Sequence, residues 1–352
     1  MRERLLGAIV GVVAIALGVA TTASDLSARP DGSPRRHLTQ AAPAVGRVES
    51  YAVASALVRR PGGTAGSVAL RSFSVAGRPY LLVVDPDTLL TSLVSAEGVR
   101  TESWPAATLR ARLSGTTYVR ALEDGRRNEG ALRDAGVTHL RRGQPGINLT
   151  VDLCPSRHPL DRRLFTTLLE QLERLERPVP VAVAVTGVWL RTHPADLDWL
   201  VGLVRSNRLA ITWVNHSFNH FWDRSRPLAS NFLLEPGTNM TEEVLATERA
   251  LIEQGLVPSV FFRFPGLVSS RELVETVVSF GLVPVGSDAW LAKGEWPTDG
   301  SIVLVHGNGN EPLGVSRFIE LLARERSAVR QHRWLLLDLR ASLVNSERTP
   351  ER

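Results

Sequence analysis

The sequence predicts an α/β protein, a distorted (β/α) barrel of about seven parallel strands with a small N-terminal α/β unit. Two observations support this fold class. From Gly146 onward, short apolar segments alternate regularly with longer helical segments, which is typical of β/α units. The short segments are apolar throughout, as expected for strands buried on both faces. An open, doubly wound sheet is the alternative.

Residues 1–23 have the layout of an export signal. Arg2 and Arg4 precede an apolar run from Leu5 to Ala20, and small residues follow. The run is nearly long enough to cross a bilayer, so a retained N-terminal membrane anchor competes with a cleaved signal peptide. Both interpretations place the remaining chain outside the inner membrane, in the periplasm, the cell envelope or the medium.

Residues 24–45 are rich in Ser, Ala, Pro, Arg and Gly, which predicts a flexible linker. Residues 46–140 are expected to form the small accessory α/β unit. Within it, alternating apolar residues predict a hairpin of Ser67–Val75 and Tyr80–Val84 that turns at Ala76-Gly77. Two segments look helical, Ala106–Leu113 and Tyr118–Ala135.

Residues 146–345 are expected to form the barrel. The predicted strands are Ile147–Asp152, Val181–Thr186, Leu209–Val214, Ser259–Arg263, Leu282–Gly286, Ser301–His306 and Trp334–Leu339. The predicted helices are Arg162–Arg174, Ala195–Ser206, Glu242–Gln254, Arg271–Phe280 and Ser316–Glu325. Asp161 and Thr241 are the expected N-caps of the first and third of these helices.

Composition excludes several classes of protein. Apolar residues make up 43% of the 352 residues, enough for a substantial core. The net charge is only +5, and the basic residues alternate with acidic ones, which argues against a nucleic-acid-binding surface. The single cysteine, Cys154, excludes an intrachain disulfide.

Polar residues stand where five predicted strands end. They are Asp152, the pair His216 and His220, Arg263, Asp288 and His306. Active sites of β/α barrels gather at this face. The two histidines are four residues apart, so on a helical turn they would share one face and bind one divalent metal. Each residue also has a structural alternative, as a cap, an ion pair or a buried core histidine.

Five short motifs follow one another within about residues 146–340. They are Leu149-Thr150-Val151-Asp152, Asn215-His216-Ser217-Phe218-Asn219-His220, Phe262-Arg263-Phe264-Pro265-Gly266, Asp288-Ala289-Trp290 and Val303-Leu304-Val305-His306. In this order they resemble the motifs of the polysaccharide deacetylases, carbohydrate esterase family 4, which share the NodB-homology domain.

The resemblance implies a distorted (β/α) barrel and metal-dependent removal of N- or O-acetyl groups from chitin-like, peptidoglycan or other acetylated glycans. It implies Asp152 as general base and His306 as general acid. His216 and His220 would bind a divalent metal, usually zinc. Arg263 would orient Asp152, and Asp288 would brace Arg263 or His306.

The resemblance also assigns two residues to substrate binding. The Gly266 amide would help to hold the oxyanion, and Leu304 would line the acetyl-methyl pocket. Trp290 is a third candidate for substrate binding, as an aromatic residue within a motif. Aromatic residues near the motifs are candidates for stacking on sugar rings or for the core, namely Phe218, Phe221, Trp222 and Trp290.

The sequence departs from the family at one metal ligand. The first motif normally carries two successive aspartates, the second a ligand, and here Leu153 stands in that place. Asp152 itself, Asp161 from the helix start or Cys154 as a thiolate would each fill the gap. Asp152-Leu153-Cys154, followed by Asp161, is similar to a divergent branch of the family.

The sequence therefore predicts a metal-dependent hydrolase that deacetylates an envelope or extracellular polysaccharide. Leu153 keeps open an alternative from another class, a catalytically inactive glycan-binding or scaffold protein on a deacetylase fold. A weaker option is an esterase or amidase for a small acylated molecule. The expected partner is an acetylated glycan, with membrane contact only through the N-terminus.

Overall fold

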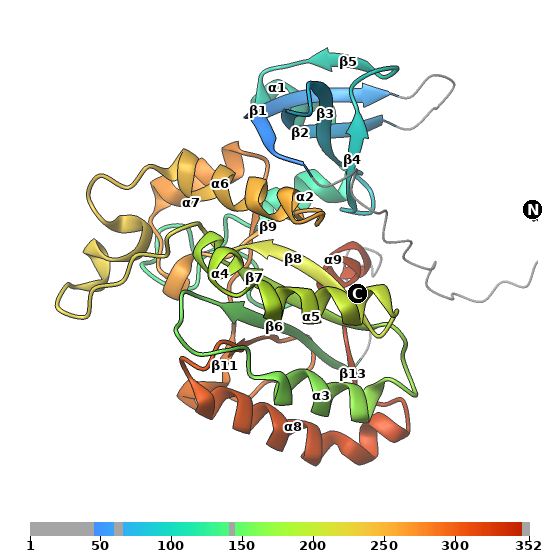
Figure 1. Ribbon diagram of the computed structural model, residues 1–352, viewed down its shortest axis with the longest axis vertical. Coiled ribbons are helices and arrows are strands. Elements are labelled where there is room, and N and C mark those ends of the chain that lie inside the picture. Colours follow the sequence, from blue (N-terminus) through green and yellow to red (C-terminus); the bar gives the residue numbers. More distant parts are fainter. Residues whose placement is uncertain (1–45, 60–65, 141–144, 347–352) are drawn as a thin grey trace, which may run out of the picture. The chain divides into compact units, whose positions relative to one another are not determined.

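The computed structural model describes residues 46–59, 66–140 and 145–346, drawn in colour in Figure 1. These residues belong to a single unit. The predicted signal or anchor and the predicted linker lie outside the described residues. No helix in the described ranges is both long and apolar enough to span a bilayer.

A curled parallel sheet forms the larger part of the fold. Its strand order is β10-β9-β8-β7-β6-β12-β11, and β13 pairs in parallel with the first residues of β6. The seven strands of this path confirm the predicted distorted barrel. The seventh of them is β11, which the sequence pattern does not predict, while the predicted strand Trp334–Leu339 is reduced to β13, off the path. Their bounds, with β13, are Gly146–Leu153 (β6), Val179–Val185 (β7), Leu209–Asn215 (β8), Phe261–Phe262 (β9), Val283–Pro284 (β10), Ala289–Trp290 (β11), Ile302–His306 (β12) and Leu335–Leu336 (β13).

Helices follow the strands in the predicted alternation. They are Arg162–Leu172 (α3), Gly187–Thr192 (α4), Pro194–Arg205 (α5), Met240–Glu253 (α6), Arg271–Ser279 (α7), Pro312–Arg330 (α8) and Leu339–Ser346 (α9). Asp161 caps α3 as predicted, because its side chain accepts a hydrogen bond from the Arg163 amide. The predicted cap Thr241 is wrong, since α6 begins earlier and Asn239 accepts the bond from the Glu242 amide.

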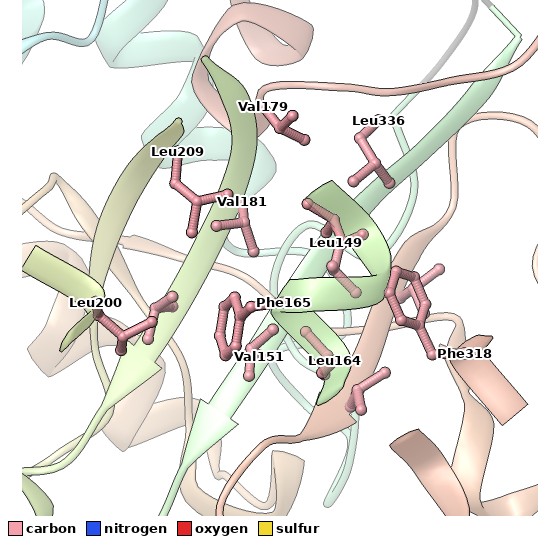
Figure 2. Close-up of a cluster of buried hydrophobic side chains, with 14 of the residues drawn as sticks. Leu149, Val151, Leu164, Phe165, Val179, Val181, Leu200, Leu209, Phe318 and Leu336 are labelled. Atoms are coloured by element: carbon pink, nitrogen blue, oxygen red, sulfur yellow. The ribbon is translucent and has the colours of Figure 1, made fainter. Parts of the chain in front are cut away.

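The barrel core lies between the sheet and its covering helices. Leu149 and Val151 of β6 pack with Leu164 and Phe165 of α3 and with Phe318 of α8, as Figure 2 shows. Alternate residues of β6 point to opposite faces of the sheet. Val151 and Leu153 therefore face this apolar layer, which leaves Thr150 and Asp152 on the other face. The pleat thus decides which strand residues reach the site.

The second sheet belongs to the predicted accessory unit and has the antiparallel order β4-β3-β2-β1-β5. The hairpin at Ala76-Gly77 is confirmed, and both residues have the positive φ that a tight hairpin turn requires. Strands β1, β4 and β5 are not predicted by the sequence pattern. The elements are Val48–Arg59 (β1), Gly66–Val75 (β2), Arg78–Val84 (β3), Thr91–Ser95 (β4), Arg100–Ser103 (β5) and Ala106–Arg112 (α1).

The predicted helix Tyr118–Ala135 is mostly wrong. Helix α2 covers only Thr117–Asp124, and the chain then passes through residues of positive φ such as Asn128 and Gly136. The segment that follows lies along the barrel, where Val137 pairs with Val285 and His139 pairs with Ser301. It therefore bridges the β10 and β12 sides of the sheet, a long-range pairing with no local sequence signal.

Candidate metal and active site

Asp152 lies at the centre of the converging strand ends. It is opposite His306 in the register of β6 and β12, and its carboxylate accepts a hydrogen bond from Arg263 at 3.1 Å. Burial acts to raise the pKa of Asp152, but Arg263 and the neighbouring histidines outweigh it and hold the pKa below its ordinary value. The carboxylate is therefore ionised at neutral pH.

Arg263 is held rigidly in this position. Its side chain is 0% exposed and also donates to the Thr150 hydroxyl (2.7 Å) and to the Gly286 carbonyl (2.7 Å). These bonds fix the guanidinium beside Asp152, so the structure brings together the two residues that the sequence analysis paired.

His216 and His220 lie on a loop after β8 and not on a helical turn, so that part of the prediction is wrong. Ser217 and His220 have positive φ, which folds the loop so that the two imidazole rings approach with centroids 4.9 Å apart. The two imidazoles are thus close to each other as expected, but a left-handed loop and not a helical turn brings them together.

Each of the two imidazoles offers one ring nitrogen to a metal. Nδ1 of His216 donates to the Arg263 carbonyl at 2.9 Å, which assigns the proton to Nδ1 and leaves a lone pair on Nε2. Nε2 of His220 is buried, and no hydrogen-bond partner for it exists within the described ranges.

Cys154 completes a group with these two histidines. One ligand atom from each of Cys154, His216 and His220 lies within 4.8 Å of the others, and the Cys154 sulfur is 3.5 Å from Nε2 of His216. Burial acts to raise the pKa of the thiol, but the His220 and His306 imidazoles outweigh it and lower the pKa to about 7. A cysteine and two histidines are a donor set that fits zinc.

Of the three residues considered for the missing ligand, the structure favours Cys154. The prediction of Asp161 as a metal ligand is wrong. Its carboxylate caps α3 and pairs with Arg163, and Asp161 is not part of the ligand group. Leu153 is buried in the apolar layer behind β6. Cys154 directly follows β6, and the Asp-Leu-Cys spacing continues the alternation of the strand. Asp152 and Cys154 therefore both lie beside Nε2 of His216, at 3.6 and 3.5 Å.

His306 is braced by a residue that the sequence analysis missed. Its Nδ1 lies 2.8 Å from a carboxylate oxygen of Glu311, and the same oxygen accepts a bond from the Trp290 indole. Burial acts to lower the pKa of His306, but Cys154, Glu311 and Asp152 outweigh it and raise the pKa well above 6.5. The only sequence signal for Glu311 is an acid five residues after the histidine.

Asp288 does not brace Arg263 or His306, so its predicted role is wrong. Its carboxylate binds the His139 ring at 2.7 Å and accepts hydrogen bonds from the Ser301 hydroxyl and the Ile302 amide. The reason is that the segment before β6 brings His139 beside the barrel, where the His139 ring binds the Asp288 carboxylate.

The residues predicted to bind substrate lie near the same strand ends. Leu304, Trp290 and Leu267 form a small apolar cluster, and the Trp290 ring lies 5.6 Å from that of His306. Gly266 has φ 61°, and a Cβ there would lie 2.4 Å from the Phe232 ring, so only glycine fits.

An aromatic face continues beyond His220. The Phe232 ring contacts His220 edge-on, and Trp222 stacks on Phe232 with centroids 5.0 Å apart. Trp222 is 52% exposed, which is unusual for so large an apolar side chain. A stacked, exposed ring beside the two histidines is suited to contact a sugar face.

No family model matches the chain. Solved structures do resemble it. A family 4 carbohydrate esterase from Bacillus anthracis matches with 19% identity and a TM-score of 0.44, over 66% of this chain and 94% of that one. One from Streptomyces lividans in complex with acetate matches with 18% identity and a TM-score of 0.35, over 55% and 91% of the two chains.

A wild-type pseudoenzyme of the same family, also from Bacillus anthracis, matches with 15% identity and a TM-score of 0.40, over 58% of this chain and 66% of that one. Two of these three structures are described as family 4 carbohydrate esterases, and the third as a pseudoenzyme of that family. They carry the name of the family that the sequence motifs resemble, and they include a protein described as a pseudoenzyme.

Proposed function

We propose that the chain is a metal-dependent hydrolase that removes N- or O-acetyl groups from an envelope or extracellular polysaccharide. One observation carries the proposal. A Cys-His-His group lies near Asp152 and His306, which stand opposite each other on β6 and β12, at the carboxyl ends of the barrel strands. The apolar run at the N-terminus supports action outside the cytoplasm.

Cys154, His216 and His220 would hold the metal, with zinc as the ion that best suits these donors. The chemistry that zinc supplies in such a site is Lewis-acid polarisation of the acyl carbonyl and of water. The buried Nε2 of His220 supports this assignment, because a buried polar atom without a partner is costly.

The chain's own residues would move the protons. Asp152, kept ionised and oriented by Arg263, accepts a proton from the attacking water. His306, held by Glu311, donates a proton to the leaving nitrogen or oxygen of the sugar. The Gly266 amide would assist at the oxyanion, Leu304 would line the pocket for the acetyl methyl group, and Trp290, which packs against Leu304, would contact the glycan.

The test joins metal content with acetate release from a panel of acetylated glycans. We expect about one equivalent of zinc in the purified chain, and much weaker binding in His216→Ala and Cys154→Ala. Asp152→Asn and His306→Ala should retain zinc and release acetate at least about 100-fold more slowly. Wild-type rates in either variant would refute the proton-transfer roles.

The thiolate ligand has its own signature. Cobalt(II) bound to the wild type should show thiolate-to-metal charge-transfer absorption, and Cys154→Ser should lose it while keeping weaker d–d bands. Unchanged charge-transfer absorption in Cys154→Ser would remove Cys154 from the site.

A second candidate is a catalytically inactive glycan-binding protein on the same fold, favoured by Leu153 in place of the usual aspartate. It predicts saturable glycan binding without acetate release, and binding that a chelator does not change. Acetate release that is lost with chelator and restored by zinc would exclude it.

A further inference from the structure

The loop that carries His216 and His220 depends on its neighbours for its shape. Ser217 and His220 hold the left-handed conformation, which is unfavourable for side chains larger than glycine unless the surroundings impose it. The loop carbonyls of Ser217 and Phe218 accept bonds from the first turn of α4, at 3.2 and 3.0 Å. The loop amides need acceptors from elsewhere.

Glu243 supplies those acceptors from α6. One of its carboxylate oxygens accepts from the backbone amides of Phe218 and Asn219, both at 2.9 Å. The other accepts from the Asn219 side-chain amide at 2.7 Å. Glu243 is only 7% exposed, so water competes little for these bonds. A single buried carboxylate therefore holds the two residues between Ser217 and His220.

Asn215 strengthens the same connection. Its side chain accepts from the Ser217 amide at 3.0 Å and donates to the Val244 carbonyl of α6 at 2.9 Å. The loop is thus tied to neighbouring residues of α6 at both ends of its left-handed turn.

Helix α6 is in turn fixed on another of its faces. Glu248 lies five residues after Glu243, about 140° further round the helix, and pairs with Arg71 of β2 at 2.6 Å. Glu253 accepts from the Val48 amide of β1 at 3.1 Å. The helix that shapes the loop is therefore anchored to the five-stranded sheet.

We propose that Glu243 is a positioning residue that holds the loop of His216 and His220 in its metal-binding conformation. The inference rests on the proposed metal site, but it concerns a residue outside the ligand group of Cys154, His216 and His220. The proposal also gives the five-stranded sheet a function, because this sheet fixes α6, the helix that carries Glu243.

The experiment measures zinc affinity of the metal-free chain by competition with a chelator. Glu243→Ala should weaken zinc binding by about 10- to 100-fold, the range found when residues that orient metal ligands are removed. The cobalt(II) d–d bands should shift and change in relative intensity, because the two imidazoles are no longer held in place. Glu243→Gln keeps one oxygen for the loop amides and should restore most of the affinity.

Asp299→Ala is the matched control. This carboxylate also accepts a backbone amide hydrogen bond, from Gly146 at 2.8 Å, but at the opposite end of β6. It should leave zinc affinity and the cobalt spectrum unchanged. If Glu243→Ala does not fold, Asn219→Ala at an exposed position tests the same clamp, with a smaller loss of affinity expected.

Wild-type zinc affinity and an unaltered cobalt spectrum in folded Glu243→Ala, or in Asn219→Ala where that variant replaces it, would overturn the positioning role. Failure of the wild type to bind zinc would instead refute the proposed metal site. The two failures are therefore distinguished by the wild-type measurement.

Discussion

The candidate site depends on individual residues whose partners the structure identifies. Glu311 holds His306 from one side, and the side-chain alternation that points Leu153 into the apolar layer puts Cys154 on the same face of the strand as Asp152. Neither the role of Glu311 nor that of Cys154 follows from the position of a residue at a strand end. Each can be tested against a residue that sequence position favours, Asp288 for the contact with His306 and position 153 for the metal ligand.

Glu311→Gln is expected to reduce kcat for acetate release by about 10-fold, because His306 loses the carboxylate that orients and charges it. Glu311 raises the pKa of His306, so its removal should move the alkaline limb of the pH–rate profile to lower pH. The profile from about pH 5 to 10 measures both effects.

Asp288→Asn is the matched control for Glu311→Gln. Its carboxylate binds His139 and the Ile302 amide, so the variant should keep the alkaline limb of the wild type. A shifted limb in Asp288→Asn with none in Glu311→Gln would reverse the assignment.

Leu153→Asp is expected not to restore the usual aspartate ligand. The side chain at 153 faces the apolar layer, so the variant should lower the free energy of unfolding by at least about 3 kcal/mol, because it buries an unpaired charge. Leu153→Met should cost less than about 1.5 kcal/mol. Urea denaturation gives both values.

Zinc content tests whether the side chain at position 153 or that at position 154 reaches the metal site. Cys154→Asp keeps a ligand on the correct face and should retain zinc, whereas Leu153→Asp with Cys154→Ala should not. Tight zinc binding by that double variant would show that position 153 reaches the site.

At the scale of elements, α6 connects the site loop to the five-stranded sheet. Arg71 and Glu248 are each 0% exposed and form a bidentate pair, to which the Tyr51 hydroxyl adds a bond. Such a pair contributes little net stability, but each partner depends strongly on the other.

Arg71→Met is therefore expected to lower the free energy of unfolding by about 3–5 kcal/mol, since Glu248 would remain buried without its partner. Adding Glu248→Leu should recover most of that loss, because an apolar pair needs no compensating charge. Urea denaturation of the single and double variants measures the difference. A single variant as stable as the wild type would contradict the argument.

At the scale of the whole molecule, one partly buried acid should make stability depend on pH. One oxygen of Glu176 is buried, and it has no hydrogen-bond partner in the part of the chain that the structure describes. Burial, with a smaller contribution from Asp338, raises the pKa of Glu176 to about 7. The folded chain then binds a proton that the unfolded chain releases above about pH 4.5.

This cost of folding grows as pH rises from about 4.5 to 7 and is complete above that range. Glu176→Gln should therefore stabilise the protein at pH 8 by about 1 kcal/mol, less than the full pKa shift implies, because the group is partly exposed. At about pH 4.5 the effect should largely disappear. Thermal or urea unfolding at both pH values checks the sign, and equal effects at both would contradict it.

Local sequence pattern is enough to predict most of the parallel strands, though not β11, and much of the site. Buried strands such as β6 and β7 appear as apolar runs, and the residue that ends a strand is found from the same pattern. Asp152, Arg263 and His306 are therefore located from the amino-acid sequence alone, as are His216 and His220.

Which side chains meet depends on the tertiary structure. Glu311 reaches the site from the start of α8 and Glu243 from α6, along loop paths with no local signal, while the segment around His139 draws Asp288 away. The left-handed turn at Ser217 and His220 is held by hydrogen bonds to α4 and α6 as well as by Asn215 of its own segment. Periodicity fixes the face of a strand on which a residue lies, but contacts between distant segments depend on how the whole chain packs.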